Sequence, residues 1–295
     1  MTFTYFLELL INGALTGLMY SLVALGIVLI YKSAGVPNLA QGAMVMLAAY
    51  LAWMFTTMMG IPLYVSIALS VVAMFLFGLL AERVLLRRMV GQPIIMIVML
   101  TLGLEIFLRG LAPGVLGSSP KSLELGIGLA PLIVGDIFIN RAYLVGAIVA
   151  LVLIGLSLLF FRTHLGTKLR AVSDDHISSW SVGISVERAI GISWGLAGIS
   201  AVAAGVLWGS VQGVDWTLSS LLFPAIAVVI LGGLDSIWGV LVGGLIVGIL
   251  GSVIPGVLDP IVGGGTRNVV TSLVILLTIL VRPHGIFGRE DIERV

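Results

Sequence analysis

The 295-residue sequence contains no cysteine and few charged residues. The lack of cysteine excludes disulfides, thiolate metal ligands and cysteine nucleophiles. Charged residues make up 10% of the chain and hydrophobic residues 59%, whereas a soluble domain carries roughly 25% charged residues. A chain this apolar cannot cover a water-exposed globule with polar surface, but it can supply many spans of roughly 20 residues each. The composition therefore predicts an all-α, polytopic transmembrane helical bundle.

Motifs for catalysis are missing as well. The chain has no G-x-x-x-x-G-K-[S/T] loop for ATP phosphates, no H-E-x-x-H and no G-x-G-x-x-G after a strand. Its three histidines, His164, His176 and His284, are far apart in sequence, which argues against a metal site. We therefore expect no enzyme, no cofactor, no metal and no nucleic-acid partner.

Long apolar stretches set the number of membrane crossings. Several of them are short or interrupted by glycine, so we expect eight to ten crossings, with nine as the best count. They fall at about residues 9–31, 43–60, 62–82, 93–112, 142–161, 189–211, 221–234, 236–254 and 268–282.

The basic residues orient these crossings. With nine spans, eleven of the fifteen Lys and Arg residues fall on one side, which the positive-inside bias makes cytoplasmic. Lys121, Arg141 and Arg267 fall on the other side, and Arg109 lies within a span. The N-terminus is then predicted outside and the C-terminus in the cytoplasm. The eleven are Lys32, Arg83, Arg87, Arg88, Arg162, Lys168, Arg170, Arg188, Arg282, Arg289 and Arg294.

Two connections are longer than turns. Residues 113–141 are predicted to face outward and to lie at the membrane interface or partly re-enter it. Residues 162–188 are predicted to face the cytoplasm, and they are the most polar segment of the chain. Neither is large enough to fold separately, so residues 1–295 are predicted to form one transmembrane domain. The 38 glycines include pairs four residues apart, such as Gly205/Gly209 and Gly244/Gly248, which favour close helix packing in lipid.

The cytoplasmic loop 162–188 is a candidate docking element. Ser173, Asp174 or Asp175 could cap a short helix in it. That helix would carry an apolar face spaced i, i+3, i+7, made of Ile177, Trp180 and Ile184. Such a helix would dock a soluble partner or, alternatively, lie on lipid headgroups. Two adjacent carboxylates fit poorly against an anionic leaflet, so we favour docking.

Four segments resemble one family. The loop pattern Arg162-x3-Gly166-x3-Arg170-Ala171-Val172, followed by Gly183–Ile184, is similar to the coupling loop of branched-chain amino acid ABC transporter permeases (LivH/LivM type). Three further stretches agree with that family in the same order: PNLAQGAMVMLAAYLAW (37–53), VVILGGLDSIWGVLVGGLIVG (228–248) and RPHGIFGRE (282–290). The chain departs from the family pattern at His176, Ser178, Ser179, Trp180 and Asp235.

The resemblance implies a permease subunit of an ABC importer in the bacterial inner membrane. It implies two cytoplasmic ATPase subunits that bind the ATP, a homologous permease or a second copy, and a periplasmic or lipid-anchored substrate-binding protein. The ATPases would grip the coupling loop at Arg162, Gly166, Arg170, Asp174, Asp175, Trp180 and Gly183. The implied substrate is a branched-chain amino acid or a related small polar solute such as urea or a short amide.

Two polar sites fall inside or between spans. The polar segment Lys32–Gly42 separates two apolar stretches. Such a break between helices is a sequence indicator of a transport site. Asn38 and Gln41 are therefore candidate pathway residues, and a simple cytoplasmic turn capped by Asn38 is the alternative. Glu105 and Arg109 are four residues apart on one predicted span. They could form a polar constriction for the substrate's charges, or a pair that fixes helix register, which we favour.

A secondary carrier with inverted repeats is the competing function. It would need coupling-ion sites at mid-membrane, whereas the charged residues found within spans are Glu105, Arg109 and, at a span end, Asp235. Neighbouring genes for two ATPases and a secreted binding protein would distinguish the two classes.

Overall fold

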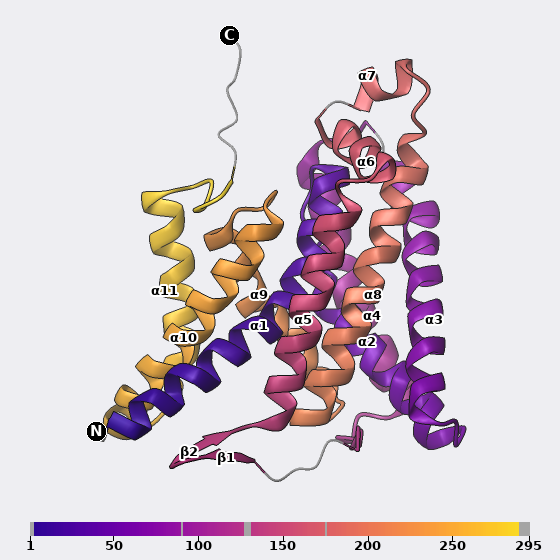
Figure 1. The fold of residues 1–295 in the computed structure, drawn as a ribbon. Coiled ribbons are helices and arrows are strands. Elements are labelled where there is room, and N and C mark those ends of the chain that lie inside the picture. The colour runs from indigo at the N-terminus through magenta and orange to yellow at the C-terminus, as the bar shows by residue number, and fades with distance from the viewer. Residues whose placement is uncertain (1–2, 90, 127–130, 175, 289–295) are drawn as a thin grey trace. The chain divides into compact units, whose positions relative to one another are not determined.

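The computed structural model describes residues 3–89, 91–126, 131–174 and 176–288. Within these ranges the regular elements are helices, apart from one two-stranded antiparallel hairpin (Figure 1). In chain order the elements are α1 (Phe3–Ala34), α2 (Gln41–Trp53), η1 (Met54–Met58), α3 (Leu63–Val84), η2 (Leu86–Met89), α4 (Ile94–Leu116), β1 (Leu132–Val134), β2 (Ile137–Ile139), α5 (Arg141–Phe160), α6 (His164–Asp174), α7 (His176–Ser181), α8 (Val186–Gln212), η3 (Trp216–Leu221), α9 (Leu222–Gly232), α10 (Ile237–Val262) and α11 (Thr266–Val281).

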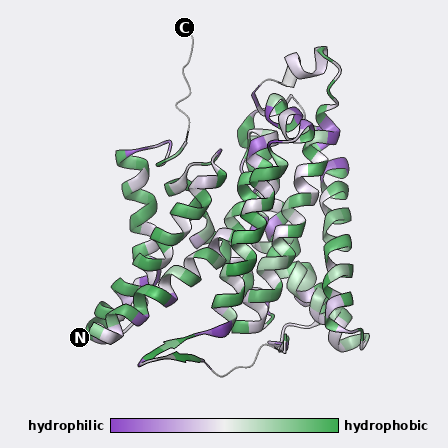
Figure 2. Cartoon of the chain, in the orientation of Figure 1, coloured by the Kyte–Doolittle hydropathy of each residue, from purple (hydrophilic) through white to green (hydrophobic). Residues whose placement is uncertain are grey.

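Seven helices in the described part are long and apolar enough to cross a membrane. Two shorter apolar helical stretches, Trp216–Gly232 and Thr266–Val281, accompany them. Each of the nine predicted stretches falls on a helix, so the multi-span helical bundle is confirmed. The count of nine and the direction of insertion stay predictions. Figure 2 shows apolar residues along most of the helix shafts, as lipid requires.

Contacts divide the chain into two compact units. Unit 1 comprises Met1–Ala24, Ile127–Ile154 and Phe223–Val295, and unit 2 comprises Leu25–Gly126 and Gly155–Leu222. Helices α1 and α5 each contribute residues to both. That residues 1–295 act as one domain stays a prediction.

Unit 1 is built on backbone contact between α1 and α10. A Cβ placed on Gly13 would lie 2.8 Å from Ser252 Cβ, and one on Gly17 would lie 2.8 Å from the carbonyl carbon of Gly244. At these positions only glycine allows the two helices to approach this closely. The close approach brings the two backbones into dispersion contact, which stabilises helix pairs in lipid. Ser21 Oγ adds a hydrogen bond to the Val240 carbonyl at 2.9 Å.

A proline inside α10 leaves a carbonyl without its helical donor. Pro255 has no N–H for the carbonyl of Gly251, four residues earlier. Arg267 Nε, on α11, donates to that oxygen at 3.1 Å. Asp259 accepts from the N–H of Thr266 at 3.2 Å, which caps the start of α11. The two helices are therefore held together by polar groups at the end where they join.

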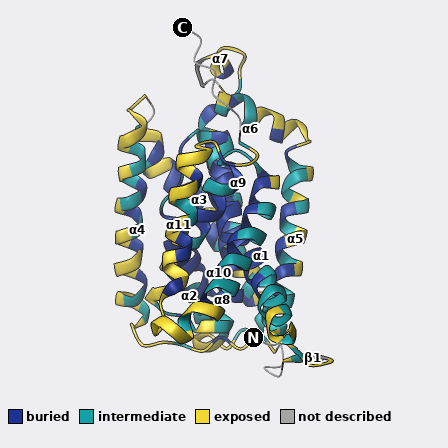
Figure 3. Cartoon of the chain, turned by 90° about the vertical axis from the view of Figure 1, so that its left-hand side faces the viewer, coloured by how far each residue is buried: buried dark blue, intermediate teal, exposed yellow. Residues whose placement is uncertain are grey.

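Unit 2 has α8 at its centre. Helix α3 packs on α8 through glycines, because a Cβ on Gly78 would lie 2.7 Å from Gly195 N and one on Gly198 would lie 2.9 Å from the Met74 carbonyl carbon. Helix α2 packs on the same helix through Gly205, whose Cβ would lie 2.9 Å from Ala49 N. Figure 3 shows exposed residues along one side of α4, where large apolar side chains such as Ile106 and Phe107 are exposed, as on a lipid-facing surface.

The predicted external loop 113–141 is shorter than expected. Helix α4 runs through Pro113 and ends only at Leu116. The next segment lies along unit 2, since Lys121 and Val214 exchange backbone hydrogen bonds of 3.1 and 2.8 Å. Lys121 Nζ also lies 4.3 Å from the centroid of the Trp53 ring. The hairpin β1–β2 then leads into α5.

Candidate functional site

Helix α2 begins inside the protein rather than at the level where α1 ends. The side chain of Gln41 lies against Gly26, where an added Cβ would be 2.5 Å from Gln41 Cδ. Gly26 precedes the end of α1 at Ala34 by eight residues, which is about 12 Å along the helix axis. The segment between the helices, in which Gly35 has φ +66°, therefore turns back alongside α1.

Asn38 and Gln41 tie this start to α8. Asn38 Nδ2 donates to Gln41 Oε1 at 3.3 Å, and Asn38 Oδ1 accepts from the N–H of Ala40 at 3.0 Å. Gln41 Nε2 donates to the carbonyl of Ala197 on α8 at 3.2 Å. Thr101 Oγ1, on α4, accepts from the N–H of Leu39 at 3.2 Å. Three helices are thus joined at one buried polar cluster.

Both amide side chains are fully buried in this structure. Asn38 accepts from the N–H of Ala40, the N-cap residue of α2, as the turn alternative expects, and this helix start is buried. A role for Asn38 and Gln41 in lining the transport route stays a prediction. In this structure the two amides bind each other, and Gln41 also binds the Ala197 carbonyl of α8.

Trp194 is the buried polar side chain that the sequence did not single out. It lies on α8 one turn before Ala197 and is 1% exposed. Its Nε1–H has no hydrogen-bond partner among the described residues. Leaving a buried donor unpaired costs roughly 1–3 kcal/mol, so its retention here needs an explanation.

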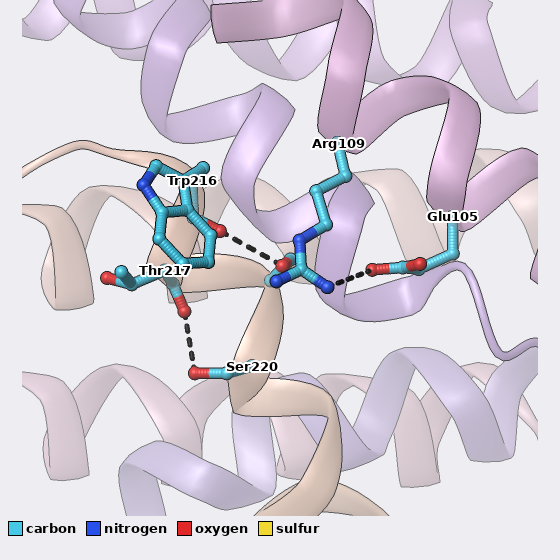
Figure 4. A network of polar contacts seen from close by, with 6 residues as sticks. Glu105, Arg109, Trp216, Thr217 and Ser220 are labelled. Carbon is cyan, nitrogen blue, oxygen red and sulfur yellow. Dashed lines mark hydrogen bonds and ion pairs between the residues drawn. The ribbon is translucent and has the colours of Figure 1, made fainter. Parts of the chain in front are cut away.

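Glu105 and Arg109 lie together on α4, as their spacing predicts (Figure 4). Arg109 Nη1 is 3.8 Å from Glu105 Oε1, and the Arg109 side chain is 44% exposed against 14% for Glu105. Arg109 Cζ also lies 5.1 Å from the centre of the Trp216 ring on η3. These contacts fit a pair that fixes α4 against η3, and whether the pair serves transport stays a prediction.

The loop 162–188, which the sequence predicts to be cytoplasmic, is more helical than predicted. Helix α6 was not expected, and it buries Gly166, Leu169 and Val172 on one side. Its end is held to α1, because Ser173 Oγ donates to the Tyr31 carbonyl at 3.3 Å. Gly166 is required by close contact, since a Cβ there would lie 2.9 Å from the Phe161 carbonyl carbon.

Helix α7 is the outlying part of this loop (Figure 1). Trp180 on α7 is 72% exposed, and Arg162, Asp174 and Gly183 are also exposed. The predicted continuous face through Ile184 is wrong, because α7 ends at Ser181 and Gly183, at φ +83°, turns the chain. Arg170 is half-buried on α6. Asp175 lies outside the residues that the structure describes.

Two of the four quoted motifs pack against each other in unit 1. The N–H groups of Ile286 and Phe287 donate to the carbonyls of Leu231 and Gly232 at 2.8 and 3.0 Å. A Cβ on Gly285 would lie 2.6 Å from Gly233 N. The C-terminal motif therefore satisfies the last carbonyls of α9. Its residues Arg289 and Glu290 lie outside the described residues.

Known proteins of similar sequence are membrane permeases. Residues 9–281 match the family described as "Branched-chain amino acid transport system / permease component". The chain is 32% identical over 282 residues to a probable branched-chain amino acid transport permease protein, LivH, of Methanocaldococcus jannaschii, covering 90% of this chain and 88% of that one. It is 28% identical over 315 residues to the high-affinity branched-chain amino acid transport system permease protein BraD of Pseudomonas aeruginosa, covering 99% and 98%.

A solved structure shares the fold. The chain matches PsaBC from Streptococcus pneumoniae in complex with Fab with a TM-score of 0.50 and 18% identity, covering 92% of this chain and 91% of that one. The family match spans all the long helices described above. The chain belongs to the family of permease components of branched-chain amino acid ABC transport systems, and is not itself an enzyme.

Proposed function

We propose that this chain forms the translocation pathway of an ABC importer for branched-chain amino acids or a related small polar solute. It works in the bacterial inner membrane with two cytoplasmic ATPases, a second permease and an external substrate-binding protein. The family match over residues 9–281 carries the proposal. High-affinity branched-chain amino acid transport is what the names of its relatives from Pseudomonas aeruginosa and Escherichia coli state.

Contacts within unit 2 support the proposed orientation. Lys32, at the end of α1, lies 5.4 Å from the Phe161 ring at the end of α5. Glu82, at the end of α3, lies beside Gly191 at the start of α8. The basic clusters 83–88 and 162–170 therefore gather at one end of unit 2, which the positive-inside bias assigns to the cytoplasm.

The loop 162–188 is the proposed entry point for the energy of ATP. Its first helix, α6, is anchored to the bundle, and α7 presents Trp180 to a partner. A ligand shifts a conformational equilibrium only by its differential affinity for the two states. Repeated cycles of inward transport therefore need energy from nucleotide hydrolysis. That energy must reach the permease through the surface to which the ATPase binds.

The test is uptake by purified components in proteoliposomes. Radiolabelled leucine should accumulate only when the ATPases, the binding protein and ATP are all present, and labelled urea serves as the alternative cargo. Uptake by this chain alone, driven by an ion gradient, would contradict the proposal and favour a secondary carrier.

Coupling is tested in the same system. Trp180→Ala and Asp175→Arg should reduce substrate-stimulated ATP hydrolysis and uptake while the melting temperature of the permease stays unchanged. Trp238→Ala, which removes another exposed tryptophan, on α10, is the matched control. Unchanged coupling in both loop variants would remove the docking assignment.

A further inference from the structure

A positively charged side chain of unit 1 reaches the middle of a spanning helix. Arg267 belongs to the first turn of α11, and its stem lies over Gly251 of α10, where an added Cβ would be 4.0 Å from Arg267 Cγ. Its Nε donates to the Gly251 carbonyl at 3.1 Å. Gly251 is fourteen residues from the start of α10 and eleven from its end, or about 21 and about 16 Å along the helix axis. The guanidinium therefore lies near the middle of a span, away from the end at which α10 and α11 join.

Tyr20 of α1 lies beside this guanidinium. The side chains of Tyr20 and Arg267 are within hydrogen-bonding reach of each other, and Tyr143 of α5 is a neighbour of Tyr20. Helix α5 contacts α1 at the same level, since a Cβ on Gly146 would lie 2.7 Å from Met19 Cγ. Tyr20 is buried and stands halfway along α1. Four helices of unit 1 thus meet around one cationic and two phenolic side chains.

The charge of Arg267 has no carboxylate partner among the residues that the structure describes. The two ion pairs of these residues both lie in unit 2. Asp259, near the start of α11, accepts instead from the N–H and the hydroxyl of Thr266. A charged side chain within a span is costly in lipid, so such residues face the protein interior or a water-filled cavity and mark the routes of substrates. Arg267 is an exposed residue of this chain, and we expect its open side to face such a route.

We propose that Arg267 and Tyr20 form a binding site for the carboxylate of the amino acid in transit. The proposal rests on the transport function above and narrows its cargo to solutes that carry a carboxylate. A guanidinium presents N–H donors in a fixed plane that matches the two oxygens of a carboxylate, and a phenol adds an O–H donor. The bond from Nε to the Gly251 carbonyl fixes the Arg267 side chain and leaves its terminal nitrogens for other acceptors. Urea and neutral amides lack the negative charge that would balance this arginine.

The first experiment separates binding of cargo from support of α10. Pro255 leaves the Gly251 carbonyl without its helical donor, and Pro255→Ala restores an N–H for it. Leucine uptake is therefore measured in the complete transporter, reconstituted with its partner subunits, for Pro255→Ala with and without Arg267→Gln. We expect Arg267→Gln to lower uptake about tenfold in this background, as for loss of one hydrogen bond to a charged group. Equal uptake with and without Arg267→Gln would show that the arginine only supports α10, and the carboxylate site would be wrong.

Two further variants control for charge and for location. Arg267→Lys keeps the positive charge without the planar donors, so its uptake should lie between those of the wild type and Arg267→Gln. Arg282→Gln removes another exposed arginine, at the other end of α11, and should retain uptake. Equal losses in Arg267→Gln and Arg282→Gln would contradict a site at Arg267.

A spectroscopic readout shows whether the cargo reaches Tyr20. The chain has six tyrosines, and in a complex in which only this chain carries fluorotyrosine, the ¹⁹F signal that disappears in Tyr20→Phe belongs to Tyr20. This signal should shift with leucine and not with leucinol, which has the same side chain and amine but no carboxylate. An equal response to both compounds, or a shift only when neutral lipid is replaced by anionic lipid, would overturn the site. The second result would assign Arg267 to a lipid phosphate.

The site and the transport function fail in different ways. If the wild type imports leucine under ATP but any of the contradicting results above is found, the carboxylate site is wrong and the transport function stands. If the wild type imports no leucine under ATP, the transport function fails, and the site fails with it.

Discussion

Units 1 and 2 both bury helices against helices, but they use different groups to do so. In unit 1, α1 and α10 touch backbone to backbone through Gly13, Gly17, Gly244 and Gly248. In unit 2, glycine contacts between α3 and α8 stand beside a buried polar cluster at the broken start of α2. Close glycine packing gives rigidity, whereas hydrogen bonds between side chains and carbonyls can be exchanged for bonds to a ligand. We infer that unit 2 holds the movable part of the route.

The largest expected effect comes from disturbing the glycine contact of unit 1. Gly17→Leu would place side-chain atoms on the Gly244 carbonyl and the Gly248 Cα. Overpacking of a close contact costs typically about 1–3 kcal/mol and sometimes more, so little folded protein should be recovered. Size-exclusion chromatography and thermal unfolding in detergent would measure this. Gly103→Leu on α4, where an added Cβ meets open space, is the control and should fold. Equal recovery of both variants would contradict the assigned packing.

The second prediction concerns function rather than folding. Gln41→Ala and Asn38→Ala remove the bonds that tie the start of α2 to α8. We expect roughly tenfold slower uptake in each, and a loss of stability of roughly 2 kcal/mol, because each deletes two buried hydrogen bonds worth roughly 1 kcal/mol apiece. Ser70→Ala, a buried hydroxyl of α3 that bonds only within its own helix, is the control. Wild-type uptake in both amide variants would favour a purely structural turn.

Much of the fold could be predicted from the sequence, and much of the site could not. The apolar stretches predicted the seven long apolar helices and the two shorter apolar ones, because lipid demands long apolar runs. The depth at which α2 begins could not be predicted from the sequence. It depends on the contacts of Gln41 with Gly26 and Ala197, which are far away in the sequence. The pairing of Gly233 with Gly285 was likewise invisible, although both lie in quoted motifs. Trp194 was missed because a tryptophan in an apolar helix gives no sign in the sequence that its N–H is unpaired. The one signal in the sequence is that this tryptophan lies among glycines.

A third, moderate effect tests the proline in α10. Arg267→Ala should lower stability by about 1–3 kcal/mol, because the Gly251 carbonyl loses its donor. In a Pro255→Ala background the residue at 255 regains an N–H that can bond this carbonyl, so the same arginine change should cost less. A double-mutant cycle in thermal unfolding measures the difference. Additive costs would show that Arg267 does not serve that carbonyl.

The smallest expected effect is at the pair on α4. Glu105→Gln should change stability by less than about 1 kcal/mol, since Arg109 is 44% exposed and the ion pair is long at 3.8 Å. Exchange of the two residues, Glu105→Arg with Arg109→Glu, should retain folding and uptake if the pair only fixes register. Loss of uptake with unchanged stability would instead place the pair in the transport route.

The side of the membrane on which α7 lies tests the account most directly. The chain has no cysteine, so Trp180→Cys introduces a single exposed thiol, and Ser118→Cys places one in the segment after α4. A membrane-impermeant maleimide should label Trp180→Cys in inside-out vesicles and not in intact cells, and Ser118→Cys should show the reverse. Labelling of Trp180→Cys from outside intact cells would contradict a cytoplasmic coupling loop and the energy supply proposed to act through it.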